Sequence, residues 1–175
     1  LTAEEAVGGE PFVVILPDDI IAHSPGVVAQ MLKVHENTGG GVVAVEAMPW
    51  ERVHNYGVVD ATPVNDRVHQ IHGLVEKPSR QEAPSNLTIV GRYILPPEIF
   101  DHLRRTPPGT NGEIQLTDAL RLLLEHYELY AYEFLGTRYD GGTPLGLLRA
   151  SLEFGLARED TRQEVLALLK TLQPE

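Results

Sequence analysis

The chain has 175 residues, enough for one domain with a sizeable hydrophobic core. Its formal net charge is -11, with 14 Lys+Arg against 25 Asp+Glu, the opposite of the balance that a nucleic-acid-binding protein normally shows. No apolar run approaches the roughly 20 residues that a membrane span needs. The absence of cysteine excludes a disulfide scaffold and a cysteine nucleophile, and it favours the cytoplasm. We therefore expect a cytoplasmic protein that binds neither nucleic acid nor membrane.

The first elements of the chain predict a βαβ unit. Residues 12–16 (FVVIL) form an uninterrupted apolar run, which is typical of a strand buried on both faces. Ser24 and Pro25 predict the N-cap and first turn of a helix, which the glycines at 39–41 end. Residues 41–47 (GVVAVEA) read as a second buried strand. This order implies parallel strands covered by helices.

The rest of the chain alternates further strands and helices. A helix that ends near His126 is expected to begin at Thr110 or Asn111, either of which can serve as its N-cap. No repeat, low-complexity segment or internal linker interrupts the pattern, so we expect one α/β unit. The predicted strands are 56–60, 68–76, 87–95 and 129–135, and the other predicted helices are 98–103, 143–157 and 161–172.

Aspartates follow two of the predicted strands. Asp18 and Asp19 lie at the carboxyl end of the first strand, where open α/β sheets bind their ligands. Mg²⁺ is the natural partner of such carboxylates, because it binds one or two of them together with phosphate oxygens. Asp140, on a turn before Gly141, is a plausible second ligand. The ordinary alternatives are that Asp19 caps a turn, that Asp18 is solvated, and that Asp140 belongs to a common Asp-Gly turn.

Residues 75–78 (VEKP) place a lysine at the end of a strand. The proline that follows Lys77 predicts an extended backbone for the lysine. The ammonium group is a point charge suited to a phosphate, and Glu76 can accept hydrogen bonds from sugar hydroxyls. The alternative is an ordinary surface ion pair.

Two glycines interrupt strand patterns. Gly57 follows Tyr56, and Gly91 follows Val90. A glycine inside a strand indicates a bulge or the close approach of a ligand to the backbone. The two glycines are explained equally well if a neighbouring helix or strand packs closely against the surface that each glycine leaves without a side chain.

Six segments together resemble a known family. In this order and spacing they are similar to the sugar-phosphate nucleotidyltransferases, and they favour the bacterial glucose-1-phosphate uridylyltransferase branch over the thymidylyltransferase branch. The resemblance runs from about residue 9 to residue 156. It implies a Rossmann-like, GT-A-like sandwich with a central mixed, mostly parallel sheet flanked by helices. The segments are LPDD (16–19), YGVVD (56–60), VEKP (75–78), SNLTIVGRYIL (85–95), GEIQLTDAL (112–120) and RYDGGTPLG (138–146).

The resemblance also implies roles for individual residues. Asp18 and Asp140 match the positions that bind Mg²⁺, and Asp18 and Lys77 match catalytic positions. Glu76 and Lys77 match the pair that holds the sugar hydroxyls and the sugar phosphate. The substrate-binding positions that the resemblance implies are Tyr56, Gly57, Glu76, Lys77, Val90 and Gly91.

The activity that the resemblance implies is nucleotidyl transfer from UTP to glucose 1-phosphate, which gives UDP-glucose and pyrophosphate. By resemblance we also expect a homodimer or homotetramer. One alternative is a metal-dependent glycosyltransferase, although such enzymes typically carry Asp-x-Asp, whereas Asp18 and Asp19 are adjacent. Another is a sugar-phosphate-binding fragment without catalytic activity.

The chain departs from the family pattern at its start. The family's glycine-rich nucleotide loop, GxGTRxxP, precedes the first predicted strand in sequence and does not occur in these residues. We therefore expect residues 1–175 to form the C-terminal two-thirds of a single nucleotidyltransferase domain within a longer protein. Such a fragment is expected to expose a sheet edge and apolar surface.

Overall fold

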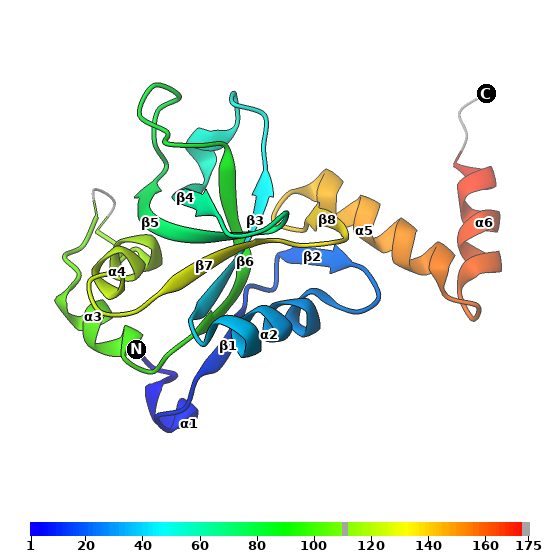
Figure 1. Ribbon diagram of the computed structural model, residues 1–175. Helices are drawn as coiled ribbons and strands as arrows, with labels where there is room; N and C mark the ends of the chain where they lie inside the picture. Colours follow the sequence, from blue (N-terminus) through cyan, green and yellow to red (C-terminus); the bar gives the residue numbers. More distant parts are fainter. Residues whose placement is uncertain (110–111, 173–175) are drawn as a thin grey trace.

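A six-stranded mixed sheet lies at the centre of the molecule (Figure 1). The computed structural model describes residues 1–109 and 112–172. In spatial order the strands are β1 (Phe12–Ile15), β6 (Leu87–Leu95), β3 (Gly41–Ala47), β7 (Leu129–Glu133), β5 (Val68–Glu76) and β4 (Gly57–Pro63). At the end of the sheet β4 also touches β6, through the pair Val58 and Thr88, so the sheet curls back on itself.

The prediction of a mixed sheet flanked by helices is confirmed, but the prediction that the sheet is mostly parallel is wrong. Among the described strands only β3 and β7 pair in parallel, and the other pairings are antiparallel. The β1 and β3 strands of the predicted βαβ unit do run in the same direction. However, β6 lies between them and is antiparallel to both. Strand β6, which comes later in the chain, thus separates β1 and β3, which the sequence pattern predicted to be neighbours.

Helices cover both faces of the sheet. Helix α2 (Val27–Thr38) packs on one face, and α3 (Ile99–Arg105) with α4 (Leu116–Leu123) on the other. Strand β3 is apolar along most of its length because successive side chains of a strand point to opposite faces, and both faces of this strand are covered. Val43 and Val45 join the cluster that contains Leu120 of α4, whereas Val42 joins the cluster that contains Met31 of α2. The prediction of a doubly buried strand at 41–47 is thus confirmed for its first five residues.

The same prediction fails for β1. This strand lies at the edge of the sheet and, in the part of the chain that the structure describes, pairs only with β6. Val13 is 37% exposed and Ile15 is 55% exposed. An apolar run by itself cannot distinguish a central strand from an edge strand, because the difference lies in the neighbours.

The start of one predicted helix is also displaced. Helix α2 begins at Val27 with Gly26 as its N-cap, and not at Ser24 and Pro25. The start predicted for the helix that became α4 is wrong as well, because α4 begins at Leu116 with Gln115 as its N-cap, and the predicted caps Thr110 and Asn111 lie outside the described residues.

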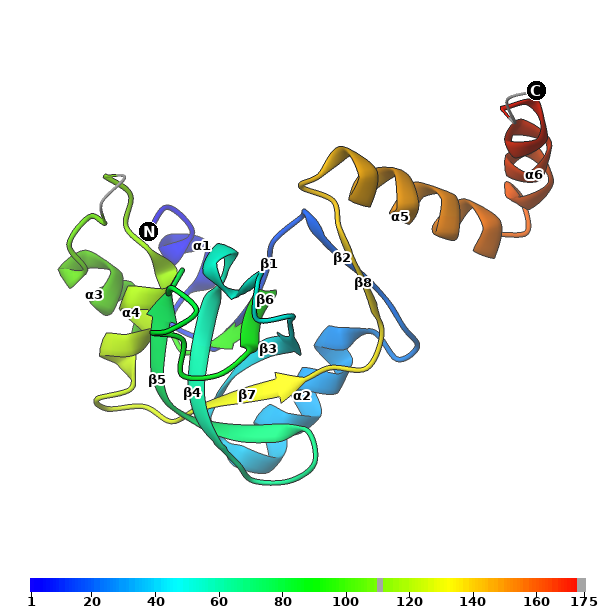
Figure 2. The same ribbon diagram turned by 90° about the horizontal axis from the view of Figure 1, so that it is seen from above.

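A separate two-stranded ribbon was not predicted. Its antiparallel strands are β2 (Asp19–Ala22) and β8 (Thr137–Asp140). From the end of β8 the chain enters helices α5 (Pro144–Ala157) and α6 (Arg162–Thr171), which extend away from the body of the molecule (Figures 1 and 2). The helices predicted at 143–157 and 161–172 are thus confirmed.

Two short elements complete the described chain. They are helix α1 (Glu4–Val7) and the 3₁₀ turn η1 (Val53–Asn55). Among the described helices, none combines the length and the apolar character that crossing a membrane requires.

Candidate functional site

The β2–β8 ribbon brings together two aspartates that are far apart in the sequence. Asp19, the first residue of β2, lies directly opposite Asp140, the last residue of β8. Beside this pair, the Gly141 N–H donates to the Asp18 carbonyl oxygen over 2.6 Å. A Cβ atom on Gly142 would lie 3.4 Å from Asp18 Oδ2 and 3.2 Å from Asp140 Oδ1. The carboxylates of Asp18 and Asp140 therefore flank the same point.

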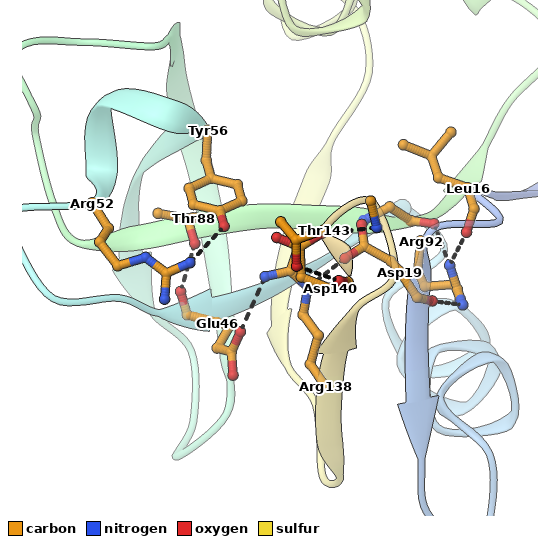
Figure 3. Close-up of polar contacts among 12 residues, drawn as sticks. Leu16, Asp19, Glu46, Arg52, Tyr56, Thr88, Arg92, Arg138, Asp140 and Thr143 are labelled. Carbon is orange, nitrogen blue, oxygen red and sulfur yellow. Dashed lines mark hydrogen bonds and ion pairs between the residues drawn. The ribbon is translucent and has the colours of Figure 1, made fainter. Parts of the chain in front are cut away.

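The loop that carries Asp18 is held from outside the ribbon. The Arg92 guanidinium donates to the carbonyl oxygen of Leu16 over 2.8 Å and also to that of Asp19 (Figure 3). Burial lowers the pKa of Arg92, while the carboxylates of Asp19 and Asp18 oppose that change. The backbone is thus fixed on both sides of Asp18, whose own side chain is exposed.

Asp18 and Asp140 form a donor set that fits Mg²⁺. Asp18 is exposed and Asp140 is half-buried, so an ion can reach both carboxylates. In residues 1–109 and 112–172, no group of three or more His, Cys, Asp or Glu side chains is placed to hold a metal, so the protein ligands of the candidate site are this pair alone. Mg²⁺ is commonly bound through one or two carboxylates, with substrate phosphates and water completing its coordination. Two accessible carboxylates therefore suit an ion that is shared with a phosphate-bearing substrate.

Asp19 has a different environment from its neighbour. It is only 7% exposed, its Oδ2 accepts the Gly91 N–H over 2.7 Å, and its Oδ1 accepts the Nε–H of Arg138. Such a carboxylate is a structural ion-pair partner and not a solvated turn cap. Of the two adjacent aspartates, Asp18 is thus the one that remains available to a ligand.

Arg138 was not identified as a site residue from the sequence. Its side chain is 7% exposed, and its Nη1 lies 3.7 Å from Glu46 Oε2 (Figure 3). The guanidinium carbon lies 5.3 Å from the centre of the Tyr56 ring. Burial lowers the pKa of Arg138, but Asp19 and Tyr56 raise it further than burial lowers it, so the group stays charged. The available signal was its spacing: Arg138 and Asp140 are two apart in a strand, so they share a face.

The hairpin of β4 and β5 carries the residues that the sequence predicts to hold the sugar. Gly57 of β4 lies directly opposite Glu76 of β5. A Cβ atom on Gly57 would lie 2.9 Å from Thr117 Oγ1 and 3.2 Å from Glu76 Oε2. A Cβ atom at this position would therefore force the neighbouring side chains to move. Thr117, a buried residue of α4, was not singled out from the sequence.

Lys77 does not have the extended backbone that Pro78 predicts. Its φ is +47°, in the left-handed region, and its N–H donates to the Tyr56 carbonyl oxygen over 3.0 Å. That hydrogen bond closes the turn and overrides the local preference, at a cost of about 1–2 kcal/mol for a residue with a Cβ atom. The Lys77 ammonium lies 3.8 Å from Glu76 Oε1, and its side chain is 58% exposed, so it remains accessible to an anion.

Val90 and Gly91 have packing explanations. Val90 is buried among side chains of the cluster around α2. A Cβ atom on Gly91 would lie 2.5 Å from the Leu16 Cβ and 2.7 Å from Asp19 Oδ2. The groups that approach Gly91 in this structure are thus protein groups, and the approach of a sugar to Val90 and Gly91 stays a prediction.

Two cavities border the candidate site. One of about 700 Å³ is lined by Arg138 and Asp140 together with residues of α5, and another of about 520 Å³ is lined by Glu76 and Lys77 together with residues of α4. Two contacts join the two sides, because the Arg138 guanidinium approaches the Tyr56 ring and the Tyr56 carbonyl oxygen accepts the Lys77 N–H. The aspartate pair and the hairpin residues therefore belong to one region.

Comparisons with known proteins identify a family for the chain. The family model for nucleotidyl transferases matches residues 1–155. A UTP–glucose-1-phosphate uridylyltransferase of Staphylococcus epidermidis is 40% identical over 171 residues, which are 98% of this chain and 59% of the relative. One of Staphylococcus haemolyticus gives the same identity and coverage. The chain thus spans about three-fifths of the length of the curated relatives that it matches.

Solved structures give the same result. A crystal structure of UDP-glucose pyrophosphorylase complexed with UDP-glucose superimposes with a TM-score of 0.84 and 43% identity, over 90% of this chain and 60% of that chain. UTP-bound UGPase from Acinetobacter baumannii superimposes with a TM-score of 0.85 and 35% identity, over 98% of this chain and 60% of that chain. A putative glucose-1-phosphate thymidylyltransferase from Bacillus anthracis superimposes with a TM-score of 0.66 and 26% identity, over 90% of this chain and 58% of that chain. The structures named for UDP-glucose pyrophosphorylase or UGPase are 35–43% identical to this chain and the thymidylyltransferase is 26% identical, which favours the predicted branch. The chain belongs to the nucleotidyl transferase family.

Proposed function

We propose that the protein transfers the uridylyl group of UTP to glucose 1-phosphate, which gives UDP-glucose and pyrophosphate. The observation that carries this proposal is the meeting of the Asp18 and Asp140 carboxylates beside Gly142. The names of the most similar relatives support it. The chain spans 59% of the length of those relatives, so both the activity and the two substrates are part of this proposal.

The reaction is an in-line substitution at phosphorus. An oxygen of glucose 1-phosphate forms a bond to the α-phosphorus of UTP, and the bond from that phosphorus to the bridging oxygen of pyrophosphate breaks. The attacking phosphate oxygen is already an anion, so no side chain has to remove a proton. The main barrier is the approach of two polyanions, and positioned positive charge lowers it.

The proposal assigns separate tasks to the two sides of the site. Lys77 holds the attacking phosphate through its exposed ammonium group. Glu76 accepts hydrogen bonds from the sugar hydroxyls, and Tyr56 with Gly57 lines the sugar pocket. Held in this way, the two substrates react as an oriented pair, which supplies a large part of the rate.

Asp18 and Asp140 would hold Mg²⁺, whose chemistry when bound is to neutralise charge on the transferred phosphate. This assignment also explains how a chain with a net charge of -11 handles anionic substrates. Asp18 is thereby both a metal ligand and a catalytic residue of the proposal.

The test is a reaction of purified protein with UTP, glucose 1-phosphate and Mg²⁺, followed by separate measurement of pyrophosphate and UDP-glucose. We expect both products in equal amounts, and only when both substrates are present. The assay is run on the 175-residue chain and on the product of the whole reading frame. Replacing UTP by dTTP, or glucose 1-phosphate by galactose 1-phosphate, defines the base and sugar preference.

Other outcomes of this assay separate the alternatives. Binding of glucose 1-phosphate by calorimetry, without pyrophosphate from either form of the protein, identifies a sugar-phosphate-binding module. Release of UDP from UDP-glucose in the presence of a sugar acceptor identifies a glycosyltransferase. Either result overturns the proposed uridylyl transfer.

We further propose that the protein is a cytoplasmic homodimer or homotetramer. Helices α5 and α6 project from the body (Figures 1 and 2). They carry exposed apolar side chains, which is typical of an interaction surface. Light scattering after size exclusion measures the assembly, and a monomer at micromolar concentration contradicts this part of the proposal. The exposed apolar residues are Leu145, Leu147, Leu148, Phe154, Leu166, Leu168 and Leu172.

A further inference from the structure

We infer that Arg138 is a positioning residue, whose ion pair with Asp19 fixes the Asp18–Asp140 metal pair and joins it to the Tyr56 side of the sugar pocket. This inference rests on the proposed function, and its test includes a measurement that does not depend on activity. It goes beyond that function because Arg138 touches neither the metal position nor a substrate in the proposed mechanism.

The first step is the burial of the pair. The side chains of Arg138 and Asp19 are 7% and 10% exposed, and the Arg138 Nε–H donates directly to Asp19 Oδ1. Asp19 Oδ2 simultaneously accepts the Gly91 N–H over 2.7 Å. A buried charge pair with additional hydrogen bonds has little freedom to rearrange, because loss of either partner leaves an unpaired charge in the interior. The strands that carry these residues are therefore held in one relative position.

The second step links that pair to the metal ligands. Asp19 stands opposite Asp140 in the ribbon, and Arg138 belongs to the same strand as Asp140. Asp18 directly precedes Asp19 in the chain. A movement of β8 against β2 would therefore change the separation of the two metal-binding carboxylates. The Arg138–Asp19 pair opposes that movement.

The third step links the pair to the sugar side. The Arg138 guanidinium carbon lies 5.3 Å from the centre of the Tyr56 ring, and Arg52 Nη2 donates to the Tyr56 hydroxyl over 3.3 Å (Figure 3). The carbonyl oxygen of Tyr56 accepts the N–H of Lys77. Arg138 is thus one contact from the turn that places the phosphate-binding lysine. A continuous path of contacts joins the two halves of the candidate site through this guanidinium.

The geometry explains why arginine stands at this position. The guanidinium meets Asp19 and Glu46 with different nitrogens and also approaches the Tyr56 ring. A planar fork with five donors makes such contacts together, whereas a lysine ammonium acts as a point charge on a flexible stem. We therefore expect Arg138→Lys to keep the fold but to hold the ribbon less firmly than arginine does.

The test measures Mn²⁺ binding by electron paramagnetic resonance in the natural protein and in Arg138→Lys and Arg138→Met. Mn²⁺ serves as the probe for the proposed Mg²⁺ position. We expect Arg138→Met to weaken Mn²⁺ binding by about tenfold, as loss of a group that orients metal ligands typically does, and Arg138→Lys to lie between it and the natural protein. Arg158→Met is the matched control, because it removes an exposed arginine that pairs with Asp160 in the segment between α5 and α6.

Kinetics then separate positioning from a general loss of stability. At saturating Mg²⁺ we expect Arg138→Lys to recover most of the turnover, while the Mg²⁺ concentration that gives half the maximal rate stays raised. Circular dichroism and the melting temperature of the same samples identify the variants that fold. If Arg138→Met does not fold, Arg138→Lys alone decides.

Unchanged Mn²⁺ affinity in a folded Arg138 variant would overturn the inference. Failure of the proposed function looks different. In that case the natural protein makes no UDP-glucose, but Mn²⁺ still binds and its affinity still responds to Arg138. If instead the natural protein binds no Mn²⁺, there is no metal pair for Arg138 to position, and the inference is overturned.

Discussion

Asp19 and Asp140 face each other across the first and last positions of the β2–β8 ribbon. This register places Asp18, which precedes Asp19, next to the loop that follows Asp140. Of these three carboxylates, only Asp19 is buried, and it is neutralised by Arg138. The ribbon therefore presents two accessible carboxylates over one buried ion pair, which is the arrangement that the proposed metal site needs.

Substitution of Asp140 tests the metal pair. We expect Asp140→Ala to lower turnover at least about 100-fold, because it removes half of the protein's ligands to an ion that stabilises the transition state. Pyrophosphate release gives the measurement. The melting temperature should change little, since Asp140 is half-buried and its carboxylate accepts the Gly142 N–H over 3.2 Å.

Asp101→Asn is the control for that experiment, because Asp101 is an exposed aspartate of α3 that pairs with Arg104. Turnover near the natural rate in Asp140→Ala would remove this residue from the metal site.

Lys77 allows charge and backbone conformation to be tested separately. Both Lys77→Ala and Lys77→Gly remove the ammonium group, so both should raise the KM for glucose 1-phosphate by at least about tenfold. The φ of +47° favours glycine at this position. We therefore expect Lys77→Gly to be more stable than Lys77→Ala by about 1 kcal/mol in urea unfolding.

The same KM in Lys77→Ala as in the natural protein would exclude Lys77 from sugar-phosphate binding. Equal stability of the two variants would show that the left-handed backbone is not strained in solution.

Gly57 and Gly91 should respond differently to alanine. Gly57→Ala brings a Cβ atom within 3.2 Å of Glu76 Oε2, so we expect a raised KM for glucose 1-phosphate with a modest change in stability. Gly91→Ala brings a Cβ atom within 2.5 Å of the Leu16 Cβ, and we expect a loss of about 1–3 kcal/mol in the free energy of unfolding.

Gly73→Ala provides the control for both glycines, since its Cβ atom would make only an ordinary contact of 3.6 Å with the Asp60 Cβ. A Gly91→Ala variant as stable as Gly73→Ala would contradict the close packing around Gly91.

Removal of divalent metal should abolish activity and leave the fold intact. EDTA is expected to stop the release of pyrophosphate, and excess Mg²⁺ to restore it. The far-ultraviolet circular dichroism should not change, because the two clusters of the core are built from apolar side chains of the sheet and of α2, α3 and α4. Activity that persists in EDTA would contradict a metal-dependent reaction.

The sequence by itself determined the elements with strong local signals. The apolar run at 41–47 gives a strand buried on both faces, and the helical spacing near the C-terminus gives α5 and α6. Asp18, Asp140, Glu76 and Lys77 were all identified as candidate site residues. The elements follow from residue types and short-range periodicity, which act within a few residues, whereas the roles of these four residues followed from the resemblance to the family.

The tertiary structure decided what depends on distant partners. Insertion of β6 between β1 and β3 makes the sheet predominantly antiparallel, and β1 lies at the edge because, among the described strands, it pairs only with β6. Neither outcome is visible in the apolar run of β1. The ribbon of β2 and β8 likewise forms only because two short segments far apart in the chain pair. The role of Arg138 follows from that pairing. Its partner Asp19 becomes close, and its charge becomes buried, only when both strands are in place, because an ion pair depends on distance in space and not on separation in sequence.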